Sequence, residues 1–302
     1  MNNLFLTLSL STLFSVCSIG QSDFVAIERE LAYHCDVMVN AAEGRHREKA
    51  HEIFIKGMND ALLQKGSYQF PFDSLKWISK KMPDDKSFRI FTWEVKQSDN
   101  EYKYYGFMQW PDGKLLPLMD RFKEAEDIKD EEFTTNNWLG SVYYNLMEVN
   151  PSGGDKYYLL FGINRWSKTE NVKLVDVLFF TKTGQPVFGK PVFRKSENKE
   201  SDVFFNRLLF MYAADGYMTV NYNPGMEMIV FDNLIPKMSR IPGQGQTYVS
   251  DGSYVGYVWD KKHWNLVNKI ATQVMETAPR PNPILDNRKG QKINGEQEKK
   301  SK

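Results

Sequence analysis

Asn206–Pro236 reads NRLLFMYAADGYMTVNYNPGMEMIVFDNLIP, and this stretch decides the fold class. Its first two apolar runs, Asn206–Tyr212 and Tyr217–Tyr222, are rich in aromatic and bulky side chains that fit a pleated, half-buried surface. Asp215-Gly216 separates them, and this pair supplies the positive φ angles of a tight hairpin turn. A proline-glycine turn then leads into Met226–Phe231. The stretch therefore predicts three consecutive antiparallel strands, a β-meander.

Alternate residues of a strand share one face of the sheet, so one face of each predicted strand is expected to fill the core. The inward residues are predicted to be Leu208, Phe210 and Tyr212 on the first strand, and Met218, Val220 and Tyr222 on the second. Truncating a buried side chain such as Phe210 is therefore expected to destabilise the fold far more than a substitution in the turn.

The composition excludes some classes of protein. Hydrophobic residues make up 41% of the 302 residues and aromatic residues 14%, which allows a sizeable core and excludes global disorder. The 39 basic side chains nearly balance the 38 acidic ones, giving a net charge of +1. Because such a balance creates no long-range field to steer a polyanion, we expect no nucleic-acid partner.

The first 20 residues form a predicted signal peptide. Leu4–Val16 is apolar but too short to span a bilayer comfortably as a helix. Ser18 and Gly20 place small residues three and one positions before a cut ahead of Gln21. The sequence therefore predicts an exported protein, periplasmic or extracellular, with no transmembrane segment in the mature chain.

A lipid anchor on Cys17 is the alternative to simple cleavage. Cys17 follows an apolar run, but Phe14-Ser15-Val16 lacks the aliphatic and small residues usual before a lipidated cysteine. After cleavage Cys35 is the single remaining cysteine, so we expect no internal disulfide. We interpret Cys35 as a small buried hydrophobe on a helix, not as a catalytic thiol.

Residues 21–83 are predicted to be helical and to pack on the β domain. Apolar residues at helical spacing indicate a first helix ending near Gly44 and a second from about His46 to Lys65. Asp73-Ser74 is expected to cap a third short helix that ends at Pro83. His46 and His51 lie five residues apart, about 140° around a helix, so they are not expected to share a metal ion.

From residue 84 to 276 the period becomes that of β-strands, and residues 277–302 are predicted to be a disordered, charged tail. Val172–Phe180 is almost wholly apolar and is expected to be a central strand, whereas Pro186 and Pro191 indicate an edge. The acidic run Lys123–Glu132 lacks the spacing of a calcium loop and is interpreted as a solvated connection. The other predicted strands are Phe88–Val95, Glu101–Trp110, Trp138–Glu148, Lys156–Asn164, Gln185–Phe193, Gln246–Ser250, Ser253–Trp259 and His263–Val267.

The predicted fold class is α+β and mostly β: a short N-terminal helical segment followed by a large antiparallel β-meander. Sequential hairpins favour a sandwich or a curled open sheet. A propeller is less well supported because no repeat of steady period is present.

Six segments carry structural hairpin signatures: FRIFTWEV at Phe88–Val95, YYLLFG at Tyr157–Gly162, LVDVLFF at Leu174–Phe180, GKPVF at Gly189–Phe193, MIVFDNL at Met228–Leu234 and DGSYVGYVW at Asp251–Trp259. Together these segments resemble a family of exported, uncharacterised proteins of Bacteroidetes-type bacteria. The resemblance spans roughly residues 88–270. It implies export and a mature start at Gln21, and it assigns no activity or catalytic residue.

The candidate catalytic residues are Asp176 and Asp232, because each carboxylate lies within an apolar run. A buried carboxylate can have a raised pKa and act as a general acid. The competing interpretation is structural: each carboxylate accepts hydrogen bonds from turn amides or from an arginine such as Arg165 or Arg207. No cofactor or metal site is predicted.

The leading functional hypothesis is a non-enzymatic binding or structural role in the periplasm or cell envelope, with a glycan or an envelope protein as partner. The alternative is a hydrolase acting on envelope or dietary glycans. A carboxylate pair facing one cavity would favour the hydrolase. Exposed aromatic rings, which can stack on sugar rings, would favour the binding protein.

Overall fold

Two helices are followed by three sheets of mostly antiparallel strands in the computed structural model, which describes residues 19–98, 101–124, 127–195, 203–268 and 270. The predicted fold class is therefore confirmed. The helices are α1 (Ile19–Asn40) and α2 (Gly44–Leu63), with short 3-10 turns at Ser67–Gln69, Phe122–Glu124 and Thr135–Asn137. The strands are β1 (Ser79–Lys81), β2 (Arg89–Ser98), β3 (Glu101–Gln109), β4 (Leu115–Met119), β5 (Val142–Val149), β6 (Tyr157–Asn164), β7 (Glu170–Phe180), β8 (Pro186–Phe188), β9 (Phe193–Arg194), β10 (Phe204–Phe205), β11 (Leu208–Ala213), β12 (Val220–Asn223), β13 (Met228–Met238), β14 (Gln246–Trp259) and β15 (Trp264–Val267).

The first four strands form one sheet, whereas the other two sheets take strands from interleaved parts of the chain, because β9 and β10 of one precede β11 of the other. Sheet I has the order β1-β2-β3-β4, and sheet II has the order β11-β7-β6-β5 with β8 also paired to β7. Sheet III has the order β10-β9-β15-β14-β13-β12. The pairings between the named strands are antiparallel except for β15 with β9, which meet in parallel at Trp264 and Phe193.

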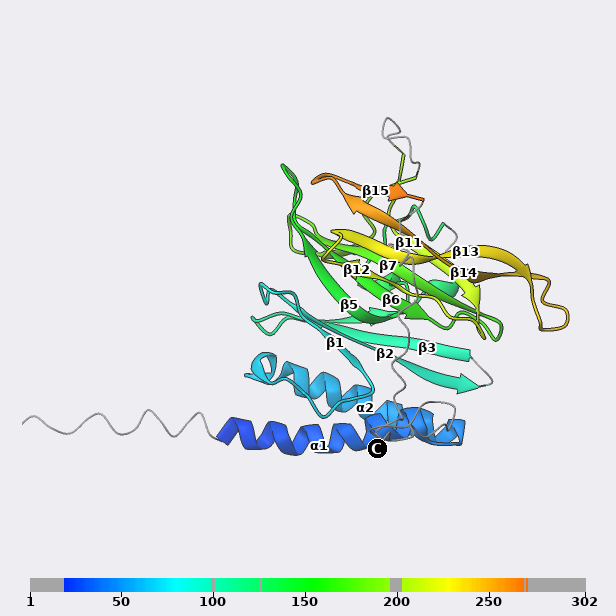
Figure 1. Cartoon of the computed structure of the whole chain (residues 1–302). Helices are drawn as coiled ribbons and strands as arrows, with labels where there is room; N and C mark the ends of the chain where they lie inside the picture. The colour runs from blue at the N-terminus through cyan, green and yellow to red at the C-terminus, as the bar shows by residue number, and fades with distance from the viewer. Residues whose placement is uncertain (1–18, 99–100, 125–126, 196–202, 269, 271–302) are drawn as a thin grey trace, which may run out of the picture. The chain divides into compact units, whose positions relative to one another are not determined.

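The helices and the three sheets stack as four layers, in the order helices, sheet I, sheet II and sheet III (Figure 1). Three hydrophobic clusters separate the layers. Phe54 of α2 packs with Trp93 of β2 between the helices and sheet I. Ile90 and Leu160 belong to the cluster between sheets I and II, and Val177 and Ile229 to the cluster between sheets II and III. Sheets I and II are thus covered on both faces.

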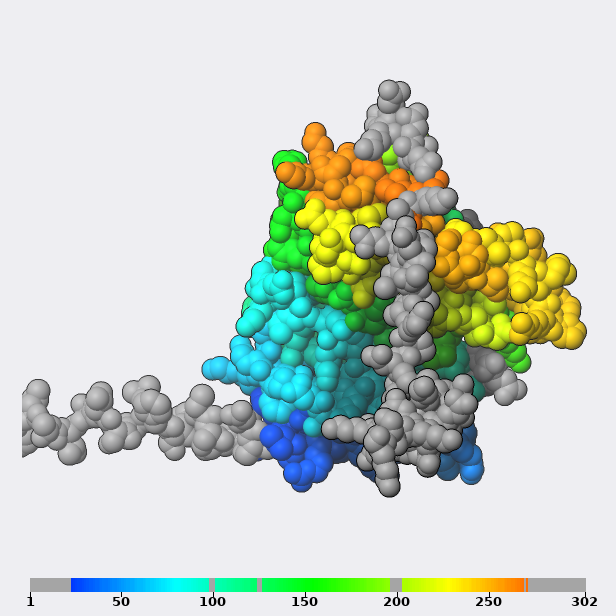
Figure 2. Space-filling model, viewed as in Figure 1, coloured from blue at the N-terminus to red at the C-terminus, as the bar shows by residue number. Residues whose placement is uncertain are grey.

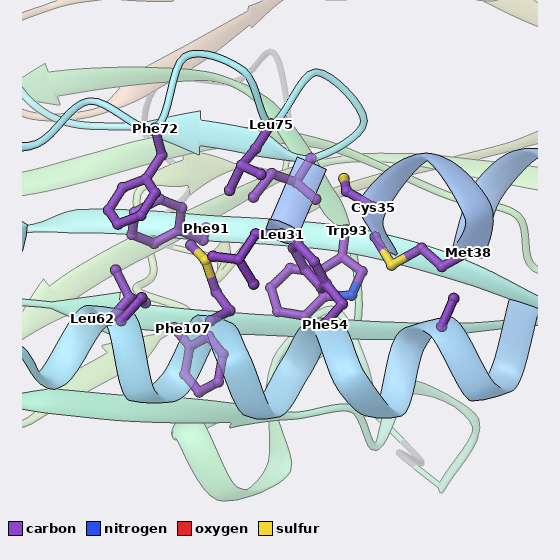
Figure 3. Close-up of a cluster of buried hydrophobic side chains, with 14 of the residues drawn as sticks. Leu31, Cys35, Met38, Phe54, Leu62, Phe72, Leu75, Phe91, Trp93 and Phe107 are labelled. Carbon is purple, nitrogen blue, oxygen red and sulfur yellow. The ribbon is translucent and has the colours of Figure 1, made fainter. Parts of the chain in front are cut away.

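The second long helix matches the prediction to within about two residues at each end, whereas the first ends at Asn40, four residues before Gly44, and Gly44 begins α2. The side chains of Leu31, Met38 and Phe54 point into the cluster that covers sheet I (Figure 3). Cys35 is 1% exposed in the same cluster, which confirms its interpretation as a buried hydrophobe.

The predicted third helix is wrong. Residues 74–78 form turns, and Ser79–Lys81 is strand β1, which pairs with β2 at the edge of sheet I. Ser74 does not cap a helix, because its backbone N–H donates to Glu28 of α1 at 2.6 Å. Lys80 Nζ donates to the carbonyl oxygens of Phe72 and Leu75 at 2.6 and 3.0 Å. These tertiary contacts stabilise the turns in place of a helical hydrogen-bond pattern.

The predicted meander is half wrong. β12 and β13 form the expected hairpin, but β11 pairs with β7 in sheet II and not with β12. Residues 214–219 therefore carry the chain from one sheet to the other. The predicted faces are right: Leu208, Tyr212, Met218 and Val220 are buried in the cluster between sheets II and III. Phe210 packs on the same cluster but is only half-buried.

The central strand of sheet II follows the prediction, but the predicted edge strand Gln185–Phe193 is only partly right, because Phe193 belongs to β9 inside sheet III. β7 pairs with β6 on one side and with β11 and β8 on the other, and both faces of its middle are buried. β8 starts at Pro186 and pairs with β7 alone among the described strands. Gln246–Ser250 and Ser253–Trp259 are one strand, β14, whose hairpin with β13 projects beyond the neighbouring strands (Figure 2).

Two predicted segments lie mostly or wholly outside the described residues: the signal peptide, up to residue 18, and the tail at 277–302. Within the described part of the chain, neither helix combines the length and apolar character needed to cross a membrane.

Candidate functional site

Asp176 is a structural carboxylate. Its side chain is fully buried, and its Oδ1 accepts from Arg207 Nε at 2.9 Å and from the Val177 backbone N–H at 2.9 Å. The hydroxyl of Tyr143 donates to Oδ2 at 3.5 Å. Of the two arginines considered from the sequence, Arg207 is the partner. Arg165 instead pairs with Glu94.

Asp232 lies in sheet III and is also held by hydrogen bonds. Its Oδ2 accepts from the backbone N–H and the hydroxyl of Thr219 at 2.5 and 2.6 Å, and its Oδ1 accepts from the Ser250 hydroxyl at 3.0 Å. Asp176 and Asp232 therefore belong to different sheets, and neither lines the cavities described below. This arrangement supports the structural interpretation of both residues.

Cys35 and His51, two side chains considered from the sequence, are both buried. Burial raises the pKa of the Cys35 thiol to about 11, so the reactive thiolate is scarce at neutral pH. Among the described residues there is no cluster of three or more histidine, cysteine, aspartate or glutamate side chains suited to a metal ion. His51 is 7% exposed and lies against the ring of Tyr105, with centroids 4.0 Å apart.

The acidic run contains an anchor for Arg207. Arg207 Nη1 donates to the backbone oxygens of Ile128 and Glu131, the latter at 2.8 Å. Asp130 pairs on the surface with Lys195, with Nζ and Oδ2 2.7 Å apart. The described part of this run is thus a surface connection fastened by its carbonyl groups, with no metal-ligating cluster.

The best candidate site is a cavity of about 320 Å³ beside strands β3 and β4, which we call the Asp120 cleft. It is lined by backbone and side chains from β3, from the end of β4 and the turn that follows it, and from the end of β6. The lining residues that matter here are Glu101, Tyr102, Tyr104, Asp120, Arg165 and Trp166.

Asp120 occupies the polar wall of the cleft. Its Oδ1 accepts from the backbone N–H groups of Phe122 and Gly140 at 3.0 and 3.2 Å, and its Oδ2 accepts from that of Tyr104 at 3.2 Å. Burial raises the pKa of the Asp120 carboxyl, and these three donors partly oppose that rise. A carboxylate that accepts three backbone hydrogen bonds is fixed in position and retains lone pairs for a ligand hydroxyl.

Tyr104, Glu94 and Arg165 form a second polar group at the cleft. The Tyr104 hydroxyl donates to Glu94 Oε2 at 3.1 Å and accepts from the Arg165 backbone N–H at 2.6 Å. Arg165 Nε donates to Glu94 Oε1 at 2.8 Å, and its guanidinium carbon lies 5.2 Å from the centre of the Tyr102 ring. The charges of this group are paired, so it offers oriented hydrogen-bonding groups without a large net charge.

Aromatic rings form the rest of the cleft. Trp166 and Tyr102 are half-buried, and the Trp166 ring packs on Phe122 with centroids 5.0 Å apart. Ring faces beside fixed hydrogen-bonding groups are typical of sites that bind amphipathic small molecules, sugars among them.

Sequence reasoning missed this cleft entirely. Asp120 follows an ordinary apolar strand, and two of its three backbone donors, Tyr104 and Gly140, lie 16 and 20 residues away in the sequence. Gly140 leaves room for Asp120, because a Cβ at this position would collide with the Asp120 carboxylate, but no pattern in the sequence links the two residues.

No protein-family model matches the chain, and no curated protein or solved structure gives a significant match. The case for a function therefore rests on the geometry of the cleft.

Proposed function

We propose that the protein is an exported, non-enzymatic glycan-binding protein and that the Asp120 cleft is its ligand site. The observation that carries the proposal is the meeting of half-buried rings, Tyr102 and Trp166, with fixed polar groups in one concave site. A pyranose presents C–H groups on its ring faces and hydroxyls around its rim. Stacking on a ring while Asp120 accepts a hydroxyl hydrogen bond satisfies both kinds of group.

Export is part of the proposal. It is supported by the apolar run before Gln21 and by the resemblance to exported proteins of Bacteroidetes-type bacteria. Mass spectrometry of the protein from its native host should find Gln21 at the mature N-terminus. An intact Met1 in the cytoplasm would contradict export, and a lipid on Cys17 would indicate an anchored form instead.

Glycan binding is tested by screening an array of envelope and plant oligosaccharides, followed by calorimetry on the best ligand. Trp166→Ala should weaken binding about tenfold or more, the factor that corresponds to about 1.4 kcal/mol. Trp77→Ala is the matched control, because Trp77 is 50% exposed and does not line the cleft. The proposal fails if no glycan binds, or if the two variants weaken binding equally.

A glycan hydrolase is the second candidate, and the raised pKa of Asp120 is the observation that favours it. Glu101 also lines the cleft, but it pairs with Lys123 at 3.1 Å, and Asp120 is already engaged by three backbone donors. Both features are better suited to holding a ligand than to transferring a proton. Incubation of the bound glycan with the protein distinguishes the two functions: products that disappear with Asp120→Asn would establish hydrolysis.

A further inference from the structure

An apolar groove of about 390 Å³ adjoins the Asp120 cleft. The two cavities share Phe122 and Trp166, so one pair of rings forms a wall common to both. The rest of the groove wall comes from β7, β11, β13 and β14 and from Ile128 and Lys129 of the acidic connection. Lys129 is the one charged residue of this lining, and the strands supply the apolar residues Val172, Leu209, Phe210, Met211, Leu234 and Tyr248.

The groove leaves large apolar side chains in contact with water. Met211 is 40% exposed and Tyr248 is 45% exposed, on opposite walls provided by sheets II and III. Covering such side chains with another apolar group is favourable, and contiguous exposed apolar surface often marks a binding site.

A sugar is a poor occupant of this groove. Lys129 is the one charged side chain of the lining, so most hydroxyls of a sugar would lose water without finding a partner, which costs free energy for each unpaired group. A hydrocarbon chain has no such groups and gains about 0.8 kcal/mol for each methylene removed from water. The groove therefore suits an alkyl or acyl chain, and its neighbour across the Phe122–Trp166 wall suits a sugar.

We infer that the ligand is a glycolipid-type amphiphile, with its sugar in the Asp120 cleft and its hydrocarbon chain in the apolar groove. This inference rests on the proposed function for the binding of the sugar, and it adds a binding site for the hydrocarbon chain. The shared ring wall places the sugar–chain junction at Phe122 and Trp166.

The test uses methyl, butyl, hexyl and octyl glycosides of one sugar that binds the protein, below their micelle concentrations, with calorimetric titration. Each added methylene should tighten the Kd roughly fourfold, which is about 0.8 kcal/mol expressed as a ratio, until the groove is filled. Met211→Lys should remove this dependence on chain length while leaving the Kd of the methyl glycoside unchanged.

Two matched controls separate the groove from a general surface effect. Met226→Lys changes a methionine that is 41% exposed on the turn between β12 and β13, and it should keep the dependence on chain length. If Met211→Lys fails to fold, Tyr248→Lys tests the opposite wall. Tyr254→Lys, at a residue 39% exposed on the same strand, serves as its control.

The outcomes distinguish the two proposals. If the methyl glycoside binds and longer chains bind no more tightly, the inference is wrong and the proposed function stands. If chain length matters equally in Met211→Lys and Met226→Lys, the chain binds elsewhere and the inference is wrong. If no sugar of the array binds, with or without an alkyl chain, both proposals fail.

Discussion

Arg207 and Asp176 form an ion pair in which both side chains are completely buried, with Arg207 Nε 2.9 Å from Asp176 Oδ1. The same guanidinium donates to the backbone oxygens of Ile128, Glu131 and Phe188. One side chain therefore fastens the acidic connection and strand β8 to the middle of sheet II. The pair stabilises the middle of sheet II, so its removal should lower the free energy of unfolding.

Arg207→Met should lower the free energy of unfolding by about 3–5 kcal/mol, because it leaves the Asp176 carboxylate buried without its partner. Arg165→Met should cost no more than about 1 kcal/mol, since Arg165 pairs with Glu94 near the surface. Urea denaturation of both variants measures the difference. Equal losses would contradict the central role of the buried pair.

The double variant Arg207→Met, Asp176→Leu should be more stable than Arg207→Met alone, because the unpaired carboxylate is gone. It should remain below the parent, since three carbonyl groups lose their donor. A double variant less stable than Arg207→Met alone would show that the carboxylate has another role.

Phe210→Ala should cost about 2 kcal/mol, below the roughly 3–5 kcal/mol for a fully buried phenylalanine. Phe210 is half-buried, and its ring packs on Phe231 with centroids 4.5 Å apart. Phe161→Ala, at a residue with 0% exposure, should reach the full range, and Asp215→Asn in the exposed turn should cost less than about 0.5 kcal/mol. Chemical denaturation gives the three values, and any other ranking would contradict this placement of the core.

Gly140→Ala should displace Asp120, because the added Cβ would overlap its carboxylate. We expect a loss of about 1–3 kcal/mol in stability, typical of overpacking, together with weaker glycan binding. Gly225→Ala is the control, since its Cβ would meet nothing closer than 3.4 Å. Unchanged binding in a folded Gly140→Ala variant would show that Asp120 does not contact the ligand.

His51 should make stability depend on pH. Burial lowers the pKa of His51 to about 4, and neither Nε2 of this side chain nor Nε1 of Trp93 has a described hydrogen-bond partner. Between pH about 6.5 and about 4 the unfolded chain binds the proton and the folded chain does not, so stability falls as the pH falls through that window. The loss should approach about 3 kcal/mol.

His51→Phe should flatten this part of the pH profile, because it removes the titrating group and keeps a ring against Tyr105. A substitution of His46, which is exposed, should leave the profile as in the parent. Melting temperatures measured from pH 4 to 7 provide the comparison. A His51→Phe profile as steep as that of the parent would assign the acid sensitivity to carboxylates.

Local signals in the sequence predicted where the strands lie better than which strands pair with one another. Alternating apolar residues and turn pairs located β3, β6, β7 and β15 to within two residues, but they ended β13 too early and divided β14 into two strands. They did not show that β11 and β12 belong to different sheets, because both outcomes leave the same residues facing the core. The predicted helix after Asp73 does not form. The hydrogen bonds from Ser74 to Glu28 and from Lys80 to Phe72 stabilise turns instead, and they outweigh the local capping signal.

The same contrast between local patterns and remote contacts distinguishes Asp176 from Asp120. An aspartate within an apolar run must have a partner, so the need for one at Asp176 was predictable from the run itself. The run did not show whether turn amides, Arg165 or Arg207 would supply it, and the structure shows Arg207. Asp120 has no such local signature. Its hydrogen-bond donors and the rings of its cleft are brought together by three separate stretches of the chain.

The position of β15 affects the order in which the layers of the protein can fold. This strand, the last in the described part of the chain, lies between β9 and β14 inside sheet III, not at its edge. A chain synthesised from its N-terminus can assemble its helices, sheet I and much of sheet II in order. Sheet III cannot be complete until Trp264–Val267 has been synthesised. Sheet III is therefore the last layer to be completed. Until β15 is in place, the hydrophobic cluster between sheets II and III stays exposed to water and to chaperones.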